Sequence, residues 1–349
     1  MKDSIAEHIR HHGFKRLLLA VSGGLDSICL AHYFICNKDA LGVEWLGIAH
    51  VHHGLREGTA DRDAAFVEAF AKAHNVPFFL KKLDGEALKS ADGSLEENAR
   101  AARYKALHET VGNCEAIVTA HHAGDQAETM YMRLRRGTTL AGLRGIQSVR
   151  HENGIAIFRP FLNETREELL AYARENGLEW CEDESNADVK FARNRVRHEL
   201  LPHLEKEYPG ATAQLCRLAT LADRTYAKVI AKSEALFANA QNGKEMPDQA
   251  GLDTTSITLD KKKLNSILRE HADADLSEML RLWLSEQGLR FPIGFFYGKN
   301  EPAHVKIPAR ATYRKRSVVK IGRTVRICEF ESPEEAQKFV SCGMKEKGL

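Results

Sequence analysis

The first half of the chain alternates short apolar runs with longer amphipathic segments, and this alternation restricts the fold more than any other feature of the sequence. The apolar runs of strand length are residues 16–21, 45–51, 76–80 and 116–120. The segments with helical patterning are residues 27–37, 60–74, 95–111 and 123–135. Strands separated by helices of this length form right-handed βαβ units with parallel strands. The sequence therefore predicts an α/β fold built on a doubly wound parallel sheet.

The pattern changes near residue 200, after which long helices dominate. The later segments with helical patterning are residues 196–205, 212–236 and 264–287. Residues 305–330 alternate like short strands, and residues 241–251 are polar and rich in turn formers, as a linker is. We therefore expect two domains, a catalytic domain over residues 1–215 and a smaller, mainly helical region with a few strands over residues 216–349.

Composition excludes several classes of protein. No apolar stretch reaches the length of about eighteen residues that a membrane-spanning helix needs. The seven cysteines are scattered and include no C-x-x-C pair, which argues against a disulfide framework and a zinc or iron–sulfur site. A reducing, cytoplasmic location is expected. The net charge of +2 says little about partners, whereas local basic clusters near residues 133–136, 193–197 and 310–323 indicate either a polyanion or solvated surfaces.

A glycine-containing loop follows the first apolar run and precedes a helix. Its residues are Ser22, Gly23, Gly24, Leu25, Asp26 and Ser27. Two glycines let backbone N–H groups approach an anion, and the following helix directs its positive end at the same place. The serine hydroxyls can donate to phosphate oxygens, and Asp26 can hold Mg²⁺. The lysine of a Walker A loop is missing, so γ-phosphate transfer is not favoured, and an ordinary glycine turn with a helix cap is the alternative.

Two further helix starts carry charged residues suited to binding. Ser94 and Glu97 form a capping box, and Arg100 and Arg103, three residues apart, share one helix face. That face could bind an anion or be solvated.

The second start, after the strand at residues 116–120, carries His121, Asp125 and Glu128. A carboxylate pair at the carboxyl edge of the sheet could hold an ammonium group, or could only complement the helix dipole. A metal site would need more ligands.

An acidic stretch at residues 180–188 is followed by a basic one at residues 191–197. The two stretches could pair with each other on the surface, and their spacing alone does not indicate a binding role.

Taken together and in order, these segments resemble the tRNA(Ile)-lysidine synthetases, which are N-type ATP pyrophosphatases with an adenine nucleotide alpha hydrolase-like fold. The matching motifs are SGGLDS (22–27), HVHHGLR (50–56), SLEENARAARY (94–104), HHAGDQAET (121–129), RRGTTLAGLRGI (135–146), RPFL (159–162), and W-x-E-D-x-S-N with F-x-R-N-x-x-R (180–197). The resemblance covers residues 16 to 202 densely and fades after 204. Thr139 departs from it, because the family usually has glycine there, and a less flexible loop is expected.

The resemblance implies a two-step reaction with ATP, Mg²⁺ and free L-lysine. The oxygen on carbon 2 of the wobble cytidine, in an isoleucine tRNA with a CAU anticodon, attacks the α-phosphate of ATP and releases pyrophosphate. The ε-amine of lysine then displaces AMP and gives lysidine. ATP would bind at residues 22–27, with Mg²⁺ on Asp26.

The resemblance also assigns roles to the other candidate residues. Asp125 and Glu128 would hold the lysine substrate, with His121 nearby, and Arg100 or Arg103 would meet a carboxylate or phosphate. The residues expected to contact RNA or phosphate are Arg136, Arg193, Asn194, Arg195 and Arg197. The region from residue 216 onward would bind the tRNA body, and a homodimer is left open.

Two alternatives stay open. A tRNA thiolase of the same class would need a sulfur-carrying thiol, for which only Cys29 and Cys181 are candidates, neither with a partner at a telling spacing. A tRNA-binding protein with an inactive nucleotide site would have a degenerate loop, whereas residues 22–27 are intact.

Overall fold

The structure is a computed structural model. It describes residues 2–54, 59–92, 94–152, 154–182, 192–238, 255–270, 276–287, 289, 297–298, 301–305, 310–313, 316–321, 324–329 and 333–334. The chain divides into two compact units, residues 1–223 and 224–349. The division falls inside helix α11 (Ala211–Phe237), the same helix in which the predicted boundary after residue 215 lies.

The first unit is built on a six-stranded sheet with the order β3-β2-β1-β4-β6-β5. Its strands are β1 (Arg16–Ala20), β2 (Trp45–His52), β3 (Phe78–Lys82), β4 (Ala116–Val118), β5 (Val149–Glu152) and β6 (Ile155–Phe158). Neighbouring strands from β3 to β6 are parallel, and β5 adds an antiparallel edge. The predicted doubly wound α/β sheet is therefore confirmed. The β5–β6 hairpin was not among the predicted elements.

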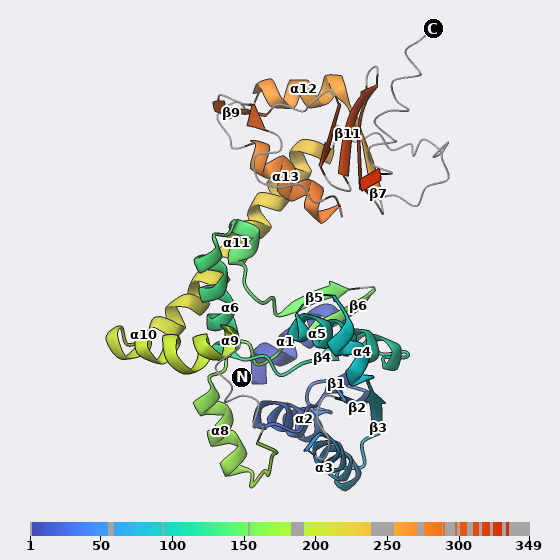
Figure 1. Ribbon diagram of the computed structural model, residues 1–349, viewed down its shortest axis with the longest axis vertical. Helices are drawn as coiled ribbons and strands as arrows, with labels where there is room; N and C mark the ends of the chain where they lie inside the picture. The colour runs from blue at the N-terminus through green and yellow to red at the C-terminus, as the bar shows by residue number, and fades with distance from the viewer. Residues whose placement is uncertain are drawn as a thin grey trace. The chain divides into compact units, whose positions relative to one another are not determined.

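Helices cover both faces of this sheet. The helices of this part of the unit are α1 (Lys2–His12), α2 (Leu25–Asn37), α3 (Thr59–Ala73), α4 (Gly85–Ser90), α5 (Leu95–Thr110), α6 (Ala123–Arg136), α7 (Leu140–Leu143) and α8 (Arg166–Glu175). Those that pack on the sheet are α1, α2, α3, α5 and α8. Successive β1 side chains point to opposite faces. Leu17 and Leu19 pack with α1, α2, α3 and α8, and Leu18 packs with Leu107 of α5. Figure 1 shows α2, α3 and α8 on one side of the strands and α5 on the other.

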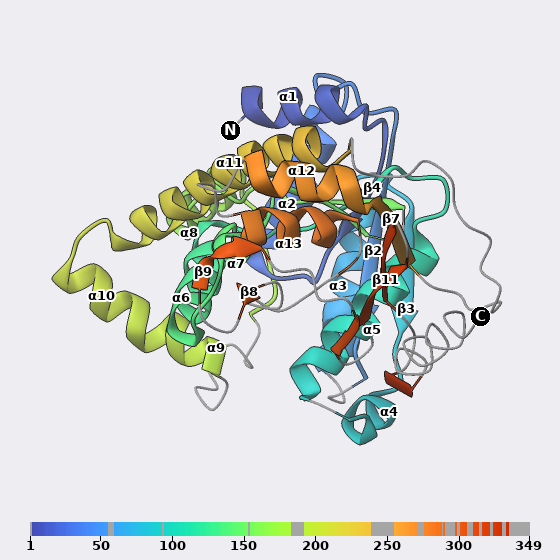
Figure 2. The same cartoon turned by 90° about the horizontal axis from the view of Figure 1, so that it is seen from above.

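A helical group follows the sheet and packs on α6. It consists of α9 (Ala192–Arg195), a π-helical turn η2 (Val196–Leu200), α10 (Leu201–Glu207) and the start of α11. Ala127 of α6, Val196 and Leu201 form its small buried core. Figure 2 shows α9 next to α6. The helix predicted at residues 196–205 thus begins earlier and contains a π-helical turn. This packing fixes residues 192–200 against the first turns of α6.

The second unit combines helices with an antiparallel sheet of order β10-β11-β12-β7. Its elements after α11 are β7 (Thr255–Asp260), α12 (Lys261–Glu270), α13 (Leu276–Glu286), β8 (Tyr297–Gly298), β9 (Glu301–Val305), β10 (Arg310–Tyr313), β11 (Arg316–Ile321) and β12 (Thr324–Glu329). Phe237, Leu280 and Trp283 pack against Leu259 and Ile327 of the sheet. Two helices occupy the segment predicted as one helix over residues 264–287. The predicted linker at residues 241–251 lies outside the described residues.

Within the described part of the chain, no helix has both the length and the apolar character required to cross a bilayer.

Candidate active site

The order of the strands in the sheet determines where a ligand site is expected. From β1 the sheet continues to β2 on one side and to β4 on the other, so the order reverses between β1 and β4. In open α/β sheets the ligand crevice lies at the carboxyl ends of the strands at such a switch point. Residues 22–27 follow β1 and residues 119–125 follow β4. The fold therefore brings the predicted phosphate loop and the predicted carboxylate pair to one edge.

The loop after β1 is held in shape by Ser27. Its Oγ accepts hydrogen bonds from the N–H groups of Ser22 and Gly23, at 3.1 and 3.2 Å, and donates to the carbonyl of Gly24 at 2.9 Å. Gly23 has φ +98°, a conformation that disfavours a side chain. Helix α2 begins at Leu25 without a side-chain cap. Its first-turn N–H groups are therefore suited to binding an anion.

Asp26, in the first turn of α2, points toward the segment that follows β4. Its Oδ2 lies 3.8 Å from Nε2 of His122 and 3.8 Å from a guanidinium nitrogen of Arg166. Burial raises the pKa of Asp26, although the charges of His122 and Arg166 oppose the shift. Its Oδ1 is buried and accepts no hydrogen bond from the described residues. An unsatisfied carboxylate oxygen beside a phosphate loop fits a ligand of Mg²⁺.

Asp125 and Glu128 lie in the first turns of α6 and are buried, with 9% and 1% of their surfaces exposed. Asp125 Oδ2 accepts a hydrogen bond from the backbone N–H of His122 at 3.0 Å and so closes a capping box. Its Oδ1 accepts from Arg193 at 3.1 Å and from Arg197 at 2.9 Å. Glu128 accepts from Nε of Arg193 at 2.7 Å and from Nε of Arg197.

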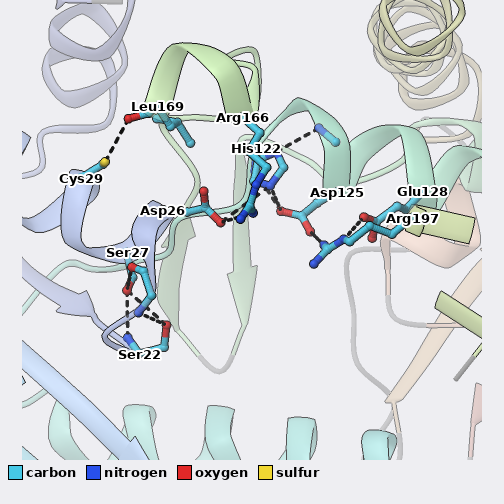
Figure 3. A network of polar contacts seen from close by, with 12 residues as sticks. Ser22, Asp26, Ser27, Cys29, His122, Asp125, Glu128, Arg166, Leu169 and Arg197 are labelled. Atoms are coloured by element: carbon cyan, nitrogen blue, oxygen red, sulfur yellow. Dashed lines mark hydrogen bonds and ion pairs between the residues drawn. The ribbon is translucent and has the colours of Figure 1, made fainter. Parts of the chain in front are cut away.

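Two carboxylates thus share two guanidiniums in a closed network, which Figure 3 shows in part with Arg197. Burial disfavours the charged forms of Asp125, Arg193 and Arg197. The neighbouring His122, His121 and Arg193 nevertheless hold the pKa of Asp125 below its ordinary value. Asp125 and Glu128 in turn raise the pKa of Arg193 and Arg197. The network therefore favours the charged forms of Asp125, Arg193 and Arg197.

His122 links the two halves of the site. Its Nε2 lies 3.8 Å from Asp26 and 3.7 Å from Asp125, and its Nδ1 accepts a hydrogen bond from Gly124 N–H. A continuous line of polar contacts therefore runs from Asp26 through His122 to Asp125 and its arginines (Figure 3).

His121 has a different hydrogen-bond partner from His122. Its Nδ1 shares a hydrogen bond of 2.9 Å with Thr119 Oγ1. Burial lowers the pKa of His121 to about 3, and the charges of Arg159, Arg103 and Arg100 favour the same neutral form, against the attraction of Asp125. His121 is therefore a neutral imidazole between Asp125 and an arginine cluster.

Two other predicted residues, Arg195 and Arg136, make no contact with this network among the described residues. Arg195 is exposed and pairs with Glu199 at 3.2 Å, while Asn194 is half-buried. Arg136 is exposed in the last turn of α6. Most of the acidic stretch, residues 183–188, and the end of HVHHGLR at residues 55–56 lie outside the described residues.

The loop at residues 137–146 is fastened to α6. The side-chain amide of Gln126 exchanges hydrogen bonds with the backbone of Ile146, at 2.6 and 3.0 Å. Gly145 has φ +62°, and a Cβ there would lie 2.3 Å from Gln126 Oε1, so only glycine fits. Thr139 has φ −99° and precedes α7. That conformation suits threonine, so its place in the loop requires no glycine.

Sequence reasoning did not select four residues that surround the site: His122, Arg166, Tyr104 and Arg159. His122 lies inside the quoted HHAGDQAET motif, next to the selected His121. Tyr104 and Arg159 also lie in quoted motifs. Arg166 has no local signal, because it reaches Asp26 only through the position of α8.

Burial disfavours the thiolate form of both candidate sulfur carriers. Cys29 is fully buried, donates a hydrogen bond to the carbonyl of Leu169, and burial raises its pKa to about 12. Burial and the nearby Asp63 raise the pKa of Cys181 to about 11. Nucleophilic sulfur chemistry needs a thiolate, which neither environment favours.

Comparison with known proteins adds three findings. A family model described as a PP-loop domain matches residues 1–204. A tRNA(Ile)-lysidine synthase of Haemophilus ducreyi is 34% identical over 276 residues, which are 79% of this chain and 59% of that protein. A tRNA(Ile)-lysidine synthase of Geobacter sulfurreducens is 40% identical over 219 residues, 62% of this chain and 46% of that protein.

Among solved structures, a U34-tRNA thiolase from Methanococcus maripaludis with its [4Fe-4S] cluster matches with a TM-score of 0.52 at 18% identity, covering 64% of this chain and 78% of that one. This likeness concerns the fold alone. The chain spans about half the length of the curated relatives, 59% and 46% in the two above.

Proposed function

The chain belongs to the PP-loop domain family, and from this premise we propose that it is a tRNA-modifying enzyme that uses ATP to attach lysine to the wobble cytidine of an isoleucine tRNA with a CAU anticodon. The observation that carries the proposal is the line of contacts joining Asp26 of the phosphate loop to Asp125 at one edge of the sheet. Similarity to the curated tRNA(Ile)-lysidine synthases supports this choice of substrates.

In the first step, the oxygen on carbon 2 of the cytidine attacks the α-phosphate of ATP. A phosphorus–oxygen bond to the base forms, the bond to the β-phosphate breaks, and pyrophosphate leaves. The N–H groups at the start of α2, which has no side-chain cap, and the hydroxyl of Ser22 would hold phosphate oxygens. Mg²⁺ held by Asp26, when bound, would supply charge compensation for the phosphates. Arg166, beside Asp26, adds a further cation at this end.

In the second step, the lysine ε-amine attacks carbon 2 of the adenylated base, and AMP leaves with the oxygen. Asp125 and Glu128 would bind and orient the substrate ammonium before it loses its proton. Both carboxylates are engaged by Arg193 and Arg197 in the structure, so the ammonium has to compete with these guanidiniums. The proposal therefore requires the arginine pairs to rearrange when lysine binds.

We assign the binding of the tRNA body to residues 216–349, which extend beyond the PP-loop match. The reducing conditions expected for the free thiols agree with a cytoplasmic location.

The test is incorporation of labelled lysine into an isoleucine tRNA transcript with a CAU anticodon, in the presence of ATP and Mg²⁺. Asp26→Ala should abolish incorporation. Asp39→Ala, an exposed aspartate after α2, is the matched control and should keep it. If no lysine is incorporated but AMP forms with another tRNA, the result would support the adenylation step and exclude lysine as the substrate. If no RNA leads to AMP formation, the result would favour the alternative of a tRNA-binding protein with an inactive nucleotide site.

A further inference from the structure

A cavity of about 650 Å³ lies between α5 and the β5–β6 hairpin. Figure 1 shows these elements next to each other in the first unit. Arg100, Tyr104 and His108 of α5 line one wall, and Arg150 of β5 and Arg159 after β6 line the other. Arg159 follows the carboxyl end of β6, so this part of the cavity wall lies at the same edge of the sheet as the phosphate loop.

The centre of the cavity wall is a tyrosine between two arginines. The guanidinium carbons of Arg100 and Arg103 lie 5.1 and 5.4 Å from the ring centroid of Tyr104. Only 8% of Tyr104 is exposed, and its hydroxyl makes no hydrogen bond of normal geometry. The charges of Arg100, Arg103 and Arg159 lower the pKa of this phenol even though burial opposes the shift.

Arg159 completes the cluster and is almost fully buried, with 4% of its surface exposed. One terminal nitrogen donates to the carbonyl of Gln147 at 2.8 Å, whereas its buried Nε has no acceptor. On the same wall as Tyr104, the Nε2 of His108 is also buried without a partner. Unsatisfied polar atoms in a cavity are costly unless a ligand supplies the missing partners.

The three arginines of the cluster also lack negative charge that would balance their own. Within the described ranges, neither Arg100, Arg103 nor Arg159 forms an ion pair with a carboxylate. Burial, reinforced by the other guanidiniums, lowers the pKa of Arg103 and Arg159. Their environment thus lacks the counter-charge that Asp125 and Glu128 give to the neighbouring Arg193 and Arg197.

The acidic residues that line the cavity do not neutralise these guanidiniums. Glu152 lies 3.7 Å from Arg150, and Glu97 and Glu109 are exposed to water on α5. Three guanidiniums around one phenol exceed what a single carboxylate needs, since one arginine satisfies a carboxylate in a bidentate manner. A phosphate group is the better match in charge and in number of acceptors.

We propose that this cavity binds a nucleotide adjoining the target cytidine, with its phosphodiester on Arg100 and Arg159 beside the Tyr104 hydroxyl. The inference rests on the proposed function and adds a subsite to it. The exposed Arg100 also offers a planar guanidinium on which an unpaired base can stack. Arg159 follows β6 and His121 follows β4, and these two strands are paired through Phe158 and Val118. A nucleotide held on Arg159 would therefore place its neighbour near the segment that carries Asp125.

The test uses full-length protein and a fluorescent anticodon stem-loop RNA, with affinity measured by anisotropy over a salt series. Arg100→Gln removes an exposed guanidinium, and Tyr104→Phe removes only the buried hydroxyl. Arg174→Gln, an exposed arginine in the last turn of α8, is the control. We expect Arg100→Gln to weaken RNA binding about tenfold and to reduce the salt slope by about 1. Tyr104→Phe should weaken it about threefold.

Lysine incorporation separates the subsite from the reaction. The two variants should raise KM for RNA while KM for lysine and kcat at saturating RNA stay within about twofold. Raised KM for lysine with unchanged RNA affinity would overturn the proposal and make the cavity an amino-acid site, and so would unchanged values for both. Weakened RNA binding in a protein that incorporates no lysine would support the subsite while refuting the reaction. Absence of RNA binding by the wild type would refute both.

Discussion

Replacing Glu128 by glutamine tests the network that joins α6 to α9 and η2. Glu128 is 1% exposed, and each of its oxygens accepts a charge-assisted hydrogen bond, from Arg193 at 2.7 Å and from Arg197. Glutamine keeps one acceptor oxygen but turns an NH₂ group toward the other guanidinium. The substitution therefore removes one hydrogen bond, creates a donor–donor contact, and removes one negative charge.

The expected loss follows from these changes. A hydrogen bond to a charged group contributes about 1.5–3 kcal/mol, and breaking a buried ion pair costs about 3–5 kcal/mol. The side chains of Arg193 and Arg197 are 26% and 27% exposed, and Asp125 remains as a partner, so water and Asp125 offset part of the loss. We expect unfolding to become easier by about 2–3 kcal/mol, which lowers Tm by about 5–10 °C for a unit of this size.

The measurement is urea or thermal unfolding followed by circular dichroism, without substrates. Glu199→Gln is the matched control because its pair with Arg195 is exposed, and it should cost about 0.5 kcal/mol or less. Combining Glu128→Gln with Arg197→Gln should recover part of the loss, giving a coupling of about 1 kcal/mol or more. A loss below about 1 kcal/mol for Glu128→Gln, or strict additivity in the double variant, would show that the carboxylate and the arginines are not coupled in solution.

Four further outcomes follow from the site. Asp26→Asn should abolish lysine incorporation yet raise Tm at pH 7. Its raised pKa reflects burial of the charged form, so the gain should disappear below about pH 4, where Asp26 is protonated in the folded and unfolded states alike. Asp125 behaves oppositely: its lowered pKa contributes stability that is present above about pH 4 and lost as acid protonates it in the folded state, so Asp125→Asn should flatten the acid limb of a Tm–pH curve. Gly23→Ala, at φ +98° and with a new Cβ 3.4 Å from Val67, should cost about 1–3 kcal/mol and weaken ATP binding in a nucleotide-binding assay. Alkylating the accessible thiols of native protein should leave Cys29 unmodified by mass spectrometry and preserve lysine incorporation, a result that a sulfur-transfer reaction through this thiol would contradict.

Periodicity was sufficient to predict the first four strands and their crossover helices. Leu17, Leu18 and Leu19 form a continuous apolar run because both faces of β1 are covered, as in parallel sheets. Periodicity was insufficient to predict β5 and β6, which have four residues each and show only weak alternation of apolar and polar residues. The helix expected over residues 264–287 shows the opposite error, because apolar residues kept a helical spacing in two successive helices.

The candidate site was predictable where it depends on local sequence. A glycine loop after one strand and acidic residues after another meet at one edge for any doubly wound sheet. The partners of Asp125 and Glu128 were not predictable, because Arg193 and Arg197 lie more than sixty residues further along the chain. Local reasoning considered pairing between the acidic and basic stretches near residue 190. Most of the acidic stretch lies outside the described residues, and the structure pairs Arg193 and Arg197 with Glu128 of α6.

The arginines at this edge form two groups that differ in their counter-charges. Arg193 and Arg197 are neutralised by Asp125 and Glu128, whereas Arg100 and Arg159 have no acidic partner in the described parts of the chain. The balanced group gives a compact, stable contact that a cationic substrate has to open. The unbalanced group would gain by accepting an anion, and the pairing of β6 with β4 brings Arg159 close to the segment that carries Asp125.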